Sequence, residues 1–468
     1  MNHLKALLFT ALILSTLLLL PLSAIDFGAT IDNSSSLAVG TKTGTEGTEL
    51  TLYQQDKVAL WFQTELGKHL NFYIQGSYTY KSDLPYLFDI DTVTLKGTFP
   101  ELSGREGVHP SLFSFTIGRF QVKDPTSYVL NHRIDGFGLT FGYPNSVVSI
   151  NLGYTGFLLK PTSSIVLSKE DANDLSENSV IFAPPRLIGL FDITFPDLYR
   201  QSISLVVLFQ EDLRGIYSTV DLLKSIYSDS LINAGEKTPQ PTEGGLVDTQ
   251  YFGLKTTGPV APSLYYGFFG YVGTGRQLTY IEKDKKYEYV PILSGLGGIR
   301  VRYFLPFLDS YTSIGYVYAT GDSTDSSIVE GNTDTLATAF NPISNSTTSG
   351  VIFSPNLKNI SNIKSEFSIK PFTNSKNNLL NNLQTMISLF VFFRNTTGPI
   401  SESGLNPDSK ALFLGTEGDI IINWRPLSDV GVSFTNGIFI PNNSQDGAFD
   451  PTQRGLEYRG VVNLSISF

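Results

Sequence analysis

Many segments of this chain alternate apolar and polar side chains over about ten residues, the period of a β-strand with two different faces. The last segment is the clearest example, with an apolar face made of Tyr458, Gly460, Val462, Leu464, Ile466 and Phe468. Its other face is mostly polar, and the same alternation recurs at 70–81 and 430–440. The pattern is typical of strands that meet lipid on one side and water on the other.

About eighteen such strands are expected, with sixteen as the smaller possibility and with ends known to a few residues. We expect them at 26–32, 50–66, 70–81, 87–98, 111–120, 135–142, 146–156, 186–195, 200–210, 248–257, 262–273, 290–304, 310–320, 364–372, 383–394, 413–424, 429–440 and 457–468.

The connections between these strands alternate in length. Short ones fall at 143–146, 196–199, 258–262, 306–309 and 425–429, and long ones at 157–185, 211–247, 274–289, 321–363, 395–412 and 441–456. Bacterial barrels have short periplasmic turns and longer extracellular loops. The sequence therefore predicts an all-β, transmembrane, antiparallel up-and-down β-barrel with both termini periplasmic, in which the first strand is the least certain.

A secreted sandwich, propeller or solenoid is the alternative fold. Such folds bury their apolar faces and lack the alternation of short and long connections. The chain also shows no internal repeat of fixed period, which counts against a propeller or solenoid.

The first 24 residues resemble a secretory signal peptide, with Lys5, an apolar run at 6–22, and small residues at Ser23 and Ala24. We expect cleavage after Ala24 and a barrel domain at 25–468, although Leu22 is large for a residue three positions before the cut. An uncleaved anchor helix is the alternative.

The composition agrees with a barrel. Charged residues make up 16% of the chain, below the ~25% of a soluble domain, while Tyr and Phe are abundant. The net charge of −10 argues against a nucleic-acid partner, and the absence of Cys excludes disulfides and thiolate chemistry. No run of ~18 apolar residues follows the signal, so strands must cross any membrane.

The chain ends on Phe468, an aromatic residue that closes an alternating strand. Such an ending resembles the assembly signal of outer-membrane barrels. We therefore expect the barrel-assembly machinery to recognise the C-terminal strand, whose open edge readily accepts another strand.

Several short motifs carry a family resemblance. They are LGTEGD at 414–419, NWRPLSD at 423–429, GIFIP at 437–441, IGR at 117–119 and DG at 135–136. The last quarter is similar to the closing strands of the alginate-export family of large porin-like barrels, and the resemblance covers about a fifth of the chain. It implies a wide, monomeric barrel with a lumen. It does not imply alginate as the solute, because the arginine-rich conduit of that family has no obvious counterpart here.

Strand parity selects candidate residues for the pore wall. Arg300 and Arg302 share the face opposite Ile299 and Val301, so they should point into the lumen, where basic side chains either attract anions or form ordinary salt bridges. The full set of expected pore-lining residues is Arg300, Arg302, Lys255, Lys370, Glu366, Glu417, Asp419, Glu457 and Arg459. Trp424, Tyr458 and Phe468 fit an aromatic membrane girdle.

Arg119 has the parity of the outward-facing Phe115 and Ile117, where an arginine in the lipid mid-plane costs roughly 2–4 kcal/mol. We therefore expect either a bulge at Gly118 or a position at the extracellular rim, with Asp135 as a possible partner.

No cluster of residues suggests catalysis, a metal site or a cofactor. The histidines are scattered, and His132 in the expected 121–134 loop is the single candidate for a catalytic base. The sequence thus favours a channel in the outer membrane, in contact with its lipid, that passes small hydrophilic solutes through a polar lumen. The alternative is a barrel that displays loops 211–247 and 321–363 for adhesion or complex formation.

Overall fold

The computed structural model describes residues 22–41, 48–100, 111–214, 246–281, 286–325, 329, 335–345, 349–377 and 379–468. Most of the expected signal peptide lies outside the described residues, and residues 22–24 form the start of the first strand. In this part of the chain, every helix is too short or too polar to span a bilayer.

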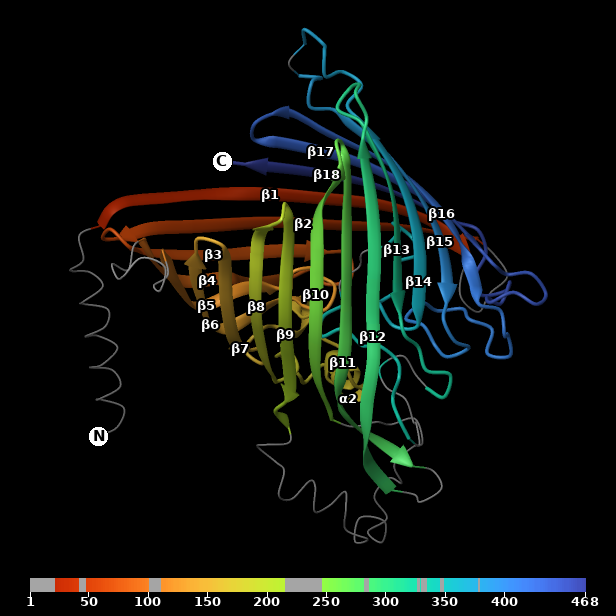
Figure 1. Cartoon of the computed structure of the whole chain (residues 1–468). Coiled ribbons are helices and arrows are strands. Elements are labelled where there is room, and N and C mark those ends of the chain that lie inside the picture. Colours follow the sequence, from red (N-terminus) through yellow and green to blue (C-terminus); the bar gives the residue numbers. More distant parts are fainter. Residues whose placement is uncertain are drawn as a thin grey trace.

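Eighteen antiparallel strands make up the fold (Figure 1). They are β1 (Leu22–Thr41), β2 (Thr48–Leu66), β3 (Leu70–Lys81), β4 (Leu87–Pro100), β5 (Leu112–Lys123), β6 (Asn131–Tyr143), β7 (Ser146–Tyr154), β8 (Arg186–Leu198), β9 (Gln201–Asp212), β10 (Val247–Ala261), β11 (Leu264–Ile281), β12 (Lys286–Phe304), β13 (Tyr311–Ala319), β14 (Ile360–Ile369), β15 (Gln384–Arg394), β16 (Phe413–Leu427), β17 (Val430–Pro441) and β18 (Glu457–Ser467). Between β7 and β8 lie a short 3-10 helix, η1 (Lys160–Thr162), and a helix, α2 (Lys169–Ser176).

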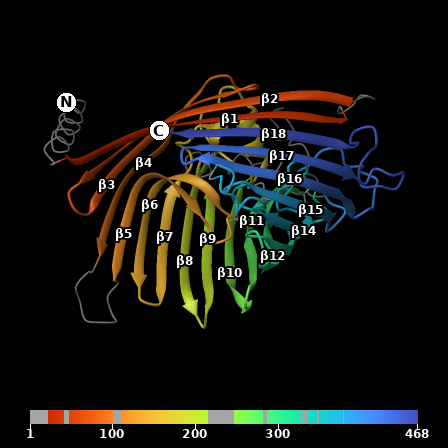
Figure 2. The same cartoon turned by 90° about the horizontal axis from the view of Figure 1, so that it is seen from above.

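Each strand pairs with its neighbours in sequence, and β1 also pairs with β18, so the sheet closes into a barrel (Figure 2). At the closing seam Thr30 faces Ser467 and Val39 faces Tyr458, and the backbone N–H of Phe468 donates to the carbonyl of Ala29 at 2.9 Å. The predicted fold class and the count of eighteen are confirmed, including the uncertain first strand.

β1 is longer than the predicted 26–32, and the reason is visible in its sequence. Residues 33–36 read Asn-Ser-Ser-Ser, so the alternation of apolar and polar side chains is lost while the backbone ladder continues to β18 and β2. Backbone pairing does not require an apolar face, and hydrophobic periodicity therefore ends before the strand does.

The two faces of the wall differ as the alternation predicts. Large apolar side chains such as Leu60, Phe88, Leu293, Ile299 and Leu389 are exposed on the outside, between 48% and 72%. Their sequence neighbours Asp89, Ser294 and Ser388 on the other face are buried. A closed strand wall with this polarity satisfies its backbone hydrogen bonds internally, which is the condition for crossing lipid.

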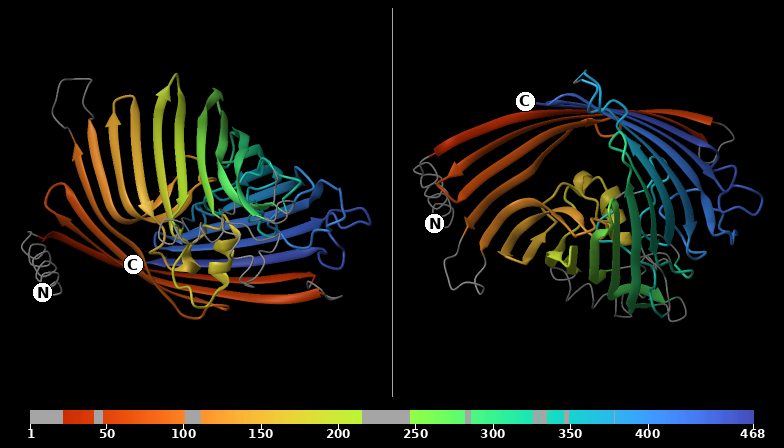
Figure 3. Two further views of the ribbon diagram at one scale, coloured as in Figure 1. Left: turned by 90° about the horizontal axis from the view of Figure 1, so that it is seen from below. Right: turned by 45° about the horizontal axis from the view of Figure 1, so that its top comes forward.

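The loops at one end of the barrel fold inward and pack against the inner wall (Figure 3). Ile165, Phe340, Ile343, Phe353 and Phe449 come from these connections and are fully buried in one hydrophobic cluster with strand residues. Loops expected mainly as solvated surface thus supply a core inside the barrel. Period-based reasoning does not find this core because the loop side chains have no regular spacing.

Candidate functional site

Three basic side chains from neighbouring strands line a cavity of about 360 Å³ on the inner wall. Lys255 of β10, Arg300 of β12 and Lys364 of β14 are joined there by Tyr128 of the 124–130 turn and by Phe390 of β15. The antiparallel ladder brings the strands side by side, and each residue occupies the face opposite the exposed apolar positions.

Glu366 is the carboxylate partner of this basic cluster. Its oxygens accept from Arg300 Nη2 and Lys364 Nζ, both at 2.6 Å, and from the Tyr311 hydroxyl at 2.9 Å. Arg302 lies over the ring of Tyr311, 4.6 Å from its centroid, in a cation–π contact. One buried carboxylate therefore serves two cations, and the cluster keeps a positive balance.

The 124–130 turn is attached to the inner wall by hydrogen bonds. Asp124 accepts from the backbone N–H groups of Val129 (3.0 Å) and Leu130 (2.7 Å) and from the Tyr271 hydroxyl (2.7 Å). Lys255 Nζ donates to the carbonyl of Pro125 at 2.5 Å. Lys255 thus anchors a loop as well as lining the cavity.

A second anchor holds the 349–353 segment against β16. Glu417 is buried and accepts from the backbone N–H groups of Ile352 (2.8 Å) and Phe353 (2.7 Å). Asp419 is buried on the same face, and Arg459 Nη1 donates to the carbonyl of Val351 at 3.4 Å. These predicted inward residues contact a loop inside the barrel.

Aromatic packing completes that anchor. Phe353 stacks on Phe439 with ring centroids 4.6 Å apart and meets Phe392 edge-on at 4.8 Å. The guanidinium of Arg454 lies about 5 Å from the rings of Phe353 and Phe439 and pairs with Glu457 at 2.7 Å. Glu457 therefore belongs to the loop anchor through Arg454.

A buried ion network fixes α2 to β8 and β9. Arg186 is fully buried and pairs with Asp171 of α2 (2.7 Å) and Asp212 (3.1 Å). Arg214 also pairs with Asp171 at 2.7 Å, and burial raises the pKa of Glu170 in the same helix. A capping box between Ser168 and Asp171 begins the helix, so Asp171 both caps α2 and ties it to the wall.

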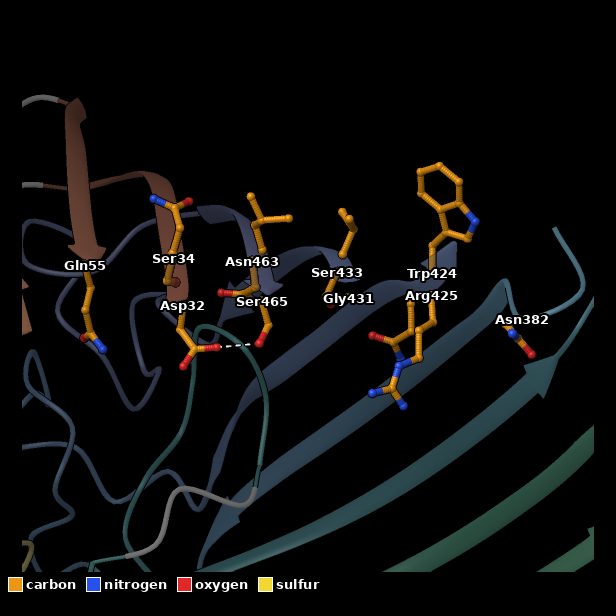
Figure 4. A pocket seen from close by; sticks show the side chains of 14 residues that line it. Asp32, Ser34, Gln55, Asn382, Trp424, Arg425, Gly431, Ser433, Asn463 and Ser465 are labelled. Atoms are coloured by element: carbon orange, nitrogen blue, oxygen red, sulfur yellow. Dashed lines mark hydrogen bonds between the residues drawn. The ribbon is translucent and has the colours of Figure 1, made fainter. Parts of the chain in front are cut away.

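Another polar cavity, of about 430 Å³, lies near the closing seam of the barrel (Figure 4). Its wall includes Asp32 of β1 and Ser465 of β18, whose side chains share a hydrogen bond of 2.6 Å. In Figure 4, Trp424 and Arg425 point to opposite sides of β16, as successive residues of a strand do. Trp424 Nε1 donates to the carbonyl of Leu379 at 2.7 Å.

The remaining predicted residues occupy separate places. Lys370 lies 3.8 Å from Asp309 in an exposed pair near a short turn. Tyr458 donates its hydroxyl hydrogen to Asn436 at 2.8 Å, and Phe468 is 72% exposed beside β1. The predicted set therefore divides into the basic cavity, the loop anchor and isolated wall positions.

Arg119 forms the predicted pair with Asp135, through bonds of 2.8 and 2.9 Å. The predicted bulge at Gly118 is wrong, because the pairing of β5 with β4 and with β6 keeps its register there. Gly118 instead takes a φ of +120°, where an added Cβ would lie 2.0 Å from the carbonyl oxygen of Val93. The irregularity lies opposite, in β4 at Asp91.

Sequence reasoning missed the two arginines that organise the loops, Arg186 and Arg454. Neither has a partner close in an obvious pattern, since Asp171 and Phe353 lie in long connections. His132 is buried and hydrogen-bonded to the carbonyl of Arg133 and to Ser163. Among the described residues, no group of three or more potential metal ligands comes together.

Comparisons with known proteins extend these observations. No family model matches the chain, and no curated protein matches its sequence. Solved structures from Pseudomonas aeruginosa are similar: OccK11 (OpdR), with a TM-score of 0.53 and 11% identity over 96% of this chain and 97% of that one, and OpdQ, with 0.52 and 10% over 95% and 98%. The outer membrane protein OprD has a TM-score of 0.53 at 10% identity, over 96% of each chain. The chain therefore shares the fold of these barrels across almost its whole length.

Proposed function

We propose that this protein is a porin-like channel of the bacterial outer membrane that passes small hydrophilic solutes. The observation that carries the proposal is the cavity on the inner wall of a closed barrel, lined by Lys255, Arg300 and Lys364. The similarity to an outer membrane protein supports the location.

The physical argument starts from the strand number. A barrel of eighteen strands encloses more space than its own side chains fill, as in porins of similar size. The inward loops then narrow the lumen, and charged side chains on its wall bias which solutes pass. Because only Glu366 balances the three cations of the cavity, we propose a preference for small anionic solutes there.

The proposed pore wall also includes the other residues selected by parity. The set is Arg300, Arg302, Lys255, Lys370, Glu366, Glu417, Asp419, Glu457 and Arg459. In this proposal the residues near Glu366 act on solutes, while Glu417 and Glu457 act through the loops that they hold.

Conductance of the refolded, heat-modifiable protein in planar bilayers tests the proposal. Discrete current steps are expected, and under a salt gradient the reversal potential should report an anion preference. Lys364→Gln should reduce that preference, whereas Lys68→Gln, an exposed lysine in the short turn after β2, should not. A folded barrel that never conducts would remove the channel and favour a display function.

The display alternative gains no support from loop 321–363. Phe340, Ile343 and Phe353 of this loop are fully buried inside the barrel. Most of the other proposed display loop, 211–247, lies outside the described residues.

Two finer expectations belong to the same proposal. The resemblance of 414–419 and 423–429 to the alginate-export family concerns kinship, and no alginate transport is proposed. The pairing of Phe468 with Ala29 is compatible with recognition of β18 by the barrel-assembly machinery before closure, when that edge is open.

A further inference from the structure

The wall of the barrel is incomplete as a backbone ladder between β4 and β5. Their pairing begins at Pro100 with Leu112 and ends at Val93 with Arg119. Beyond this point, the pairings of the described strands join residues 87–92 to β3 only and residues 120–123 to β6 only. The extra residue Asp91 in β4 lies where the two strands separate.

Arginine side chains replace the missing ladder. Arg119 Nη1 donates to the carbonyl of Ile90 at 3.0 Å, and Arg133 Nη1 donates to the carbonyl of Asp91 at 3.3 Å. Arg119 Nη2 also donates to the carbonyl of Phe157 at 2.9 Å, which holds the first residues of the next long loop beside the seam. Carbonyls that a neighbouring strand would normally satisfy are thus bound by guanidinium groups.

Ion pairs reinforce this bridge and balance its charge. Arg119 pairs with Asp135 at 2.8 Å, Arg133 pairs with Asp89 at 3.0 Å and Asp91 at 2.8 Å, and Lys57 pairs with Asp91 at 2.8 Å. Three cations thus meet three carboxylates, so the seam has no net charge to attract an ionised ligand.

On the outer face beside the seam lies a cavity of about 650 Å³. Its floor is made of two cross-strand rows, Val58 with Tyr78 and Phe88, and Leu60 with Gly76 and Ile90. One side is formed by Arg119, Phe157 and Leu159. Leu60, Phe88, Ile90 and Phe157 are 51% to 72% exposed, so the groove is apolar and open to the outside of the barrel.

The next row toward the loops that fold into the barrel is polar. Asp56 pairs with Tyr80 across β2 and β3, and its Oδ1 accepts from Asn33 at 2.6 Å and Gln54 at 3.0 Å. The groove therefore has an apolar floor that ends at a hydrogen-bonding edge. This is the polarity of an amphiphile at the boundary of a membrane, where acyl chains meet headgroups.

We propose that this groove, formed by β2, β3, β4 and the 157–159 segment, binds the acyl chain of a lipid from the outer leaflet. The inference rests on the proposed location in the outer membrane. The apolar floor is continuous with the exposed outer face of the barrel, so lipid is the occupant that reaches it. Phe157, placed through its carbonyl by Arg119, turns a flat wall into a groove with a side.

Gly76 supplies a direct way to fill the groove. Its nearest neighbour to an added Cβ is the carbonyl oxygen of Asp89 at 3.7 Å, an ordinary contact, so a leucine side chain fits in the groove without moving the backbone. Gly270 is a matched control on β11, because an added Cβ there meets nothing within 4 Å and its cross-strand partner Leu254 is an exposed apolar residue.

The experiment uses the full chain in vesicles of phosphatidylethanolamine and phosphatidylglycerol. A trace of phosphatidylethanolamine carries a photoactivatable diazirine on its acyl chain, and the labelled residues are mapped by mass spectrometry after illumination. We expect excess labelling near Gly76 and Ile90 over the outer face around Gly270. Gly76→Leu should abolish the excess and Gly270→Leu should leave it.

Equal labelling of the two regions, or an excess that survives Gly76→Leu, would overturn the proposal. Phe157→Ala removes the side of the groove without touching the barrel ladder, so it gives a second test with the same expected loss if the leucine variant does not fold. Conductance is measured separately: a silent channel would count against the proposed function, while the labelling pattern alone decides the groove.

Discussion

The strongest quantitative prediction concerns the anchor that Glu417 provides for the 349–353 segment. The carboxylate accepts two backbone hydrogen bonds, from Ile352 at 2.8 Å and Phe353 at 2.7 Å, and it is buried. Glu417→Ala removes both acceptors and leaves two buried N–H groups without a partner. The segment should therefore leave the wall more often.

The magnitude follows from the two bonds. A hydrogen bond to a charged group is worth roughly 1.5–3 kcal/mol, so the loss is about 3–6 kcal/mol before relaxation. Since about 1.4 kcal/mol corresponds to a factor of ten, the ratio of docked to released segment should fall by about one hundred to ten thousand times. Glu417→Gln keeps an acceptor oxygen but not the charge, so its effect should be roughly half as large in free energy.

Thiol labelling measures this release directly, because the chain contains no cysteine. Ser349 is a suitable reporter: its hydroxyl is buried and has no hydrogen-bond partner, so Ser349→Cys replaces it without loss. Maleimide should modify Cys at this position faster in Glu417→Ala than in the otherwise natural chain, with Glu417→Gln between them. Current noise in planar bilayers should increase in the same order.

Lys370→Gln is the control, since Lys370 and Asp309 form an exposed pair 3.8 Å apart, of a kind that contributes about 0–1 kcal/mol. Labelling rates that are the same for Glu417→Ala and Lys370→Gln would refute the reasoning, because the anchor would then carry none of the docking energy.

Three further predictions follow from the same contacts. Glu366→Gln removes the carboxylate beside Arg300, so the reversal potential should shift toward anions; an unchanged potential would contradict the basic cavity as a selectivity element. Arg186→Met leaves buried carboxylates unpaired, which costs about 3–5 kcal/mol, and protease should cut α2 faster than in the natural chain unless the network is not structural. Burial raises the pKa of Asp322, but hydrogen bonds, including those from Thr324, outweigh it and the net pKa lies below 3.8; its stabilisation of loop 321–359 is present above that pH and lost as the pH falls through the folded value. Protease protection of this loop should differ between the natural chain and Asp322→Asn at neutral pH and converge in acid, and a constant difference would exclude Asp322 as the titrating group.

The pair of Arg119 and Asp135 shows how far sequence reasoning reached into the site. Parity alone identified Arg119 as an outward arginine that needs a partner, and the adjacent strand offered Asp135. The contacts with Ile90 and Phe157 were not predictable, because they depend on β4 and β5 separating at Asp91. A one-residue irregularity in a strand leaves no clear mark in a hydrophobic pattern.

The anchored loops mark the same limit from the other side. Glu417 and Glu457 were recognised as inward-facing, yet their contacts are with Ile352 and Arg454 in long connections. Side chains in irregular segments have no period, so their placement follows from the space that the barrel encloses. The inward residues were found, while the loops that they hold were not.

The eighteen strands, their order, and the alternation of short and long connections were legible in the sequence by itself. Strand pairing between neighbours is local, and the two-residue period records which face meets lipid. Only the tertiary structure decided how the loops fill the barrel, how Arg186 and Arg454 hold them, and where the wall opens between β4 and β5. These features arise from contacts between residues far apart in the chain, whose energy depends on three-dimensional packing and leaves no periodic signal.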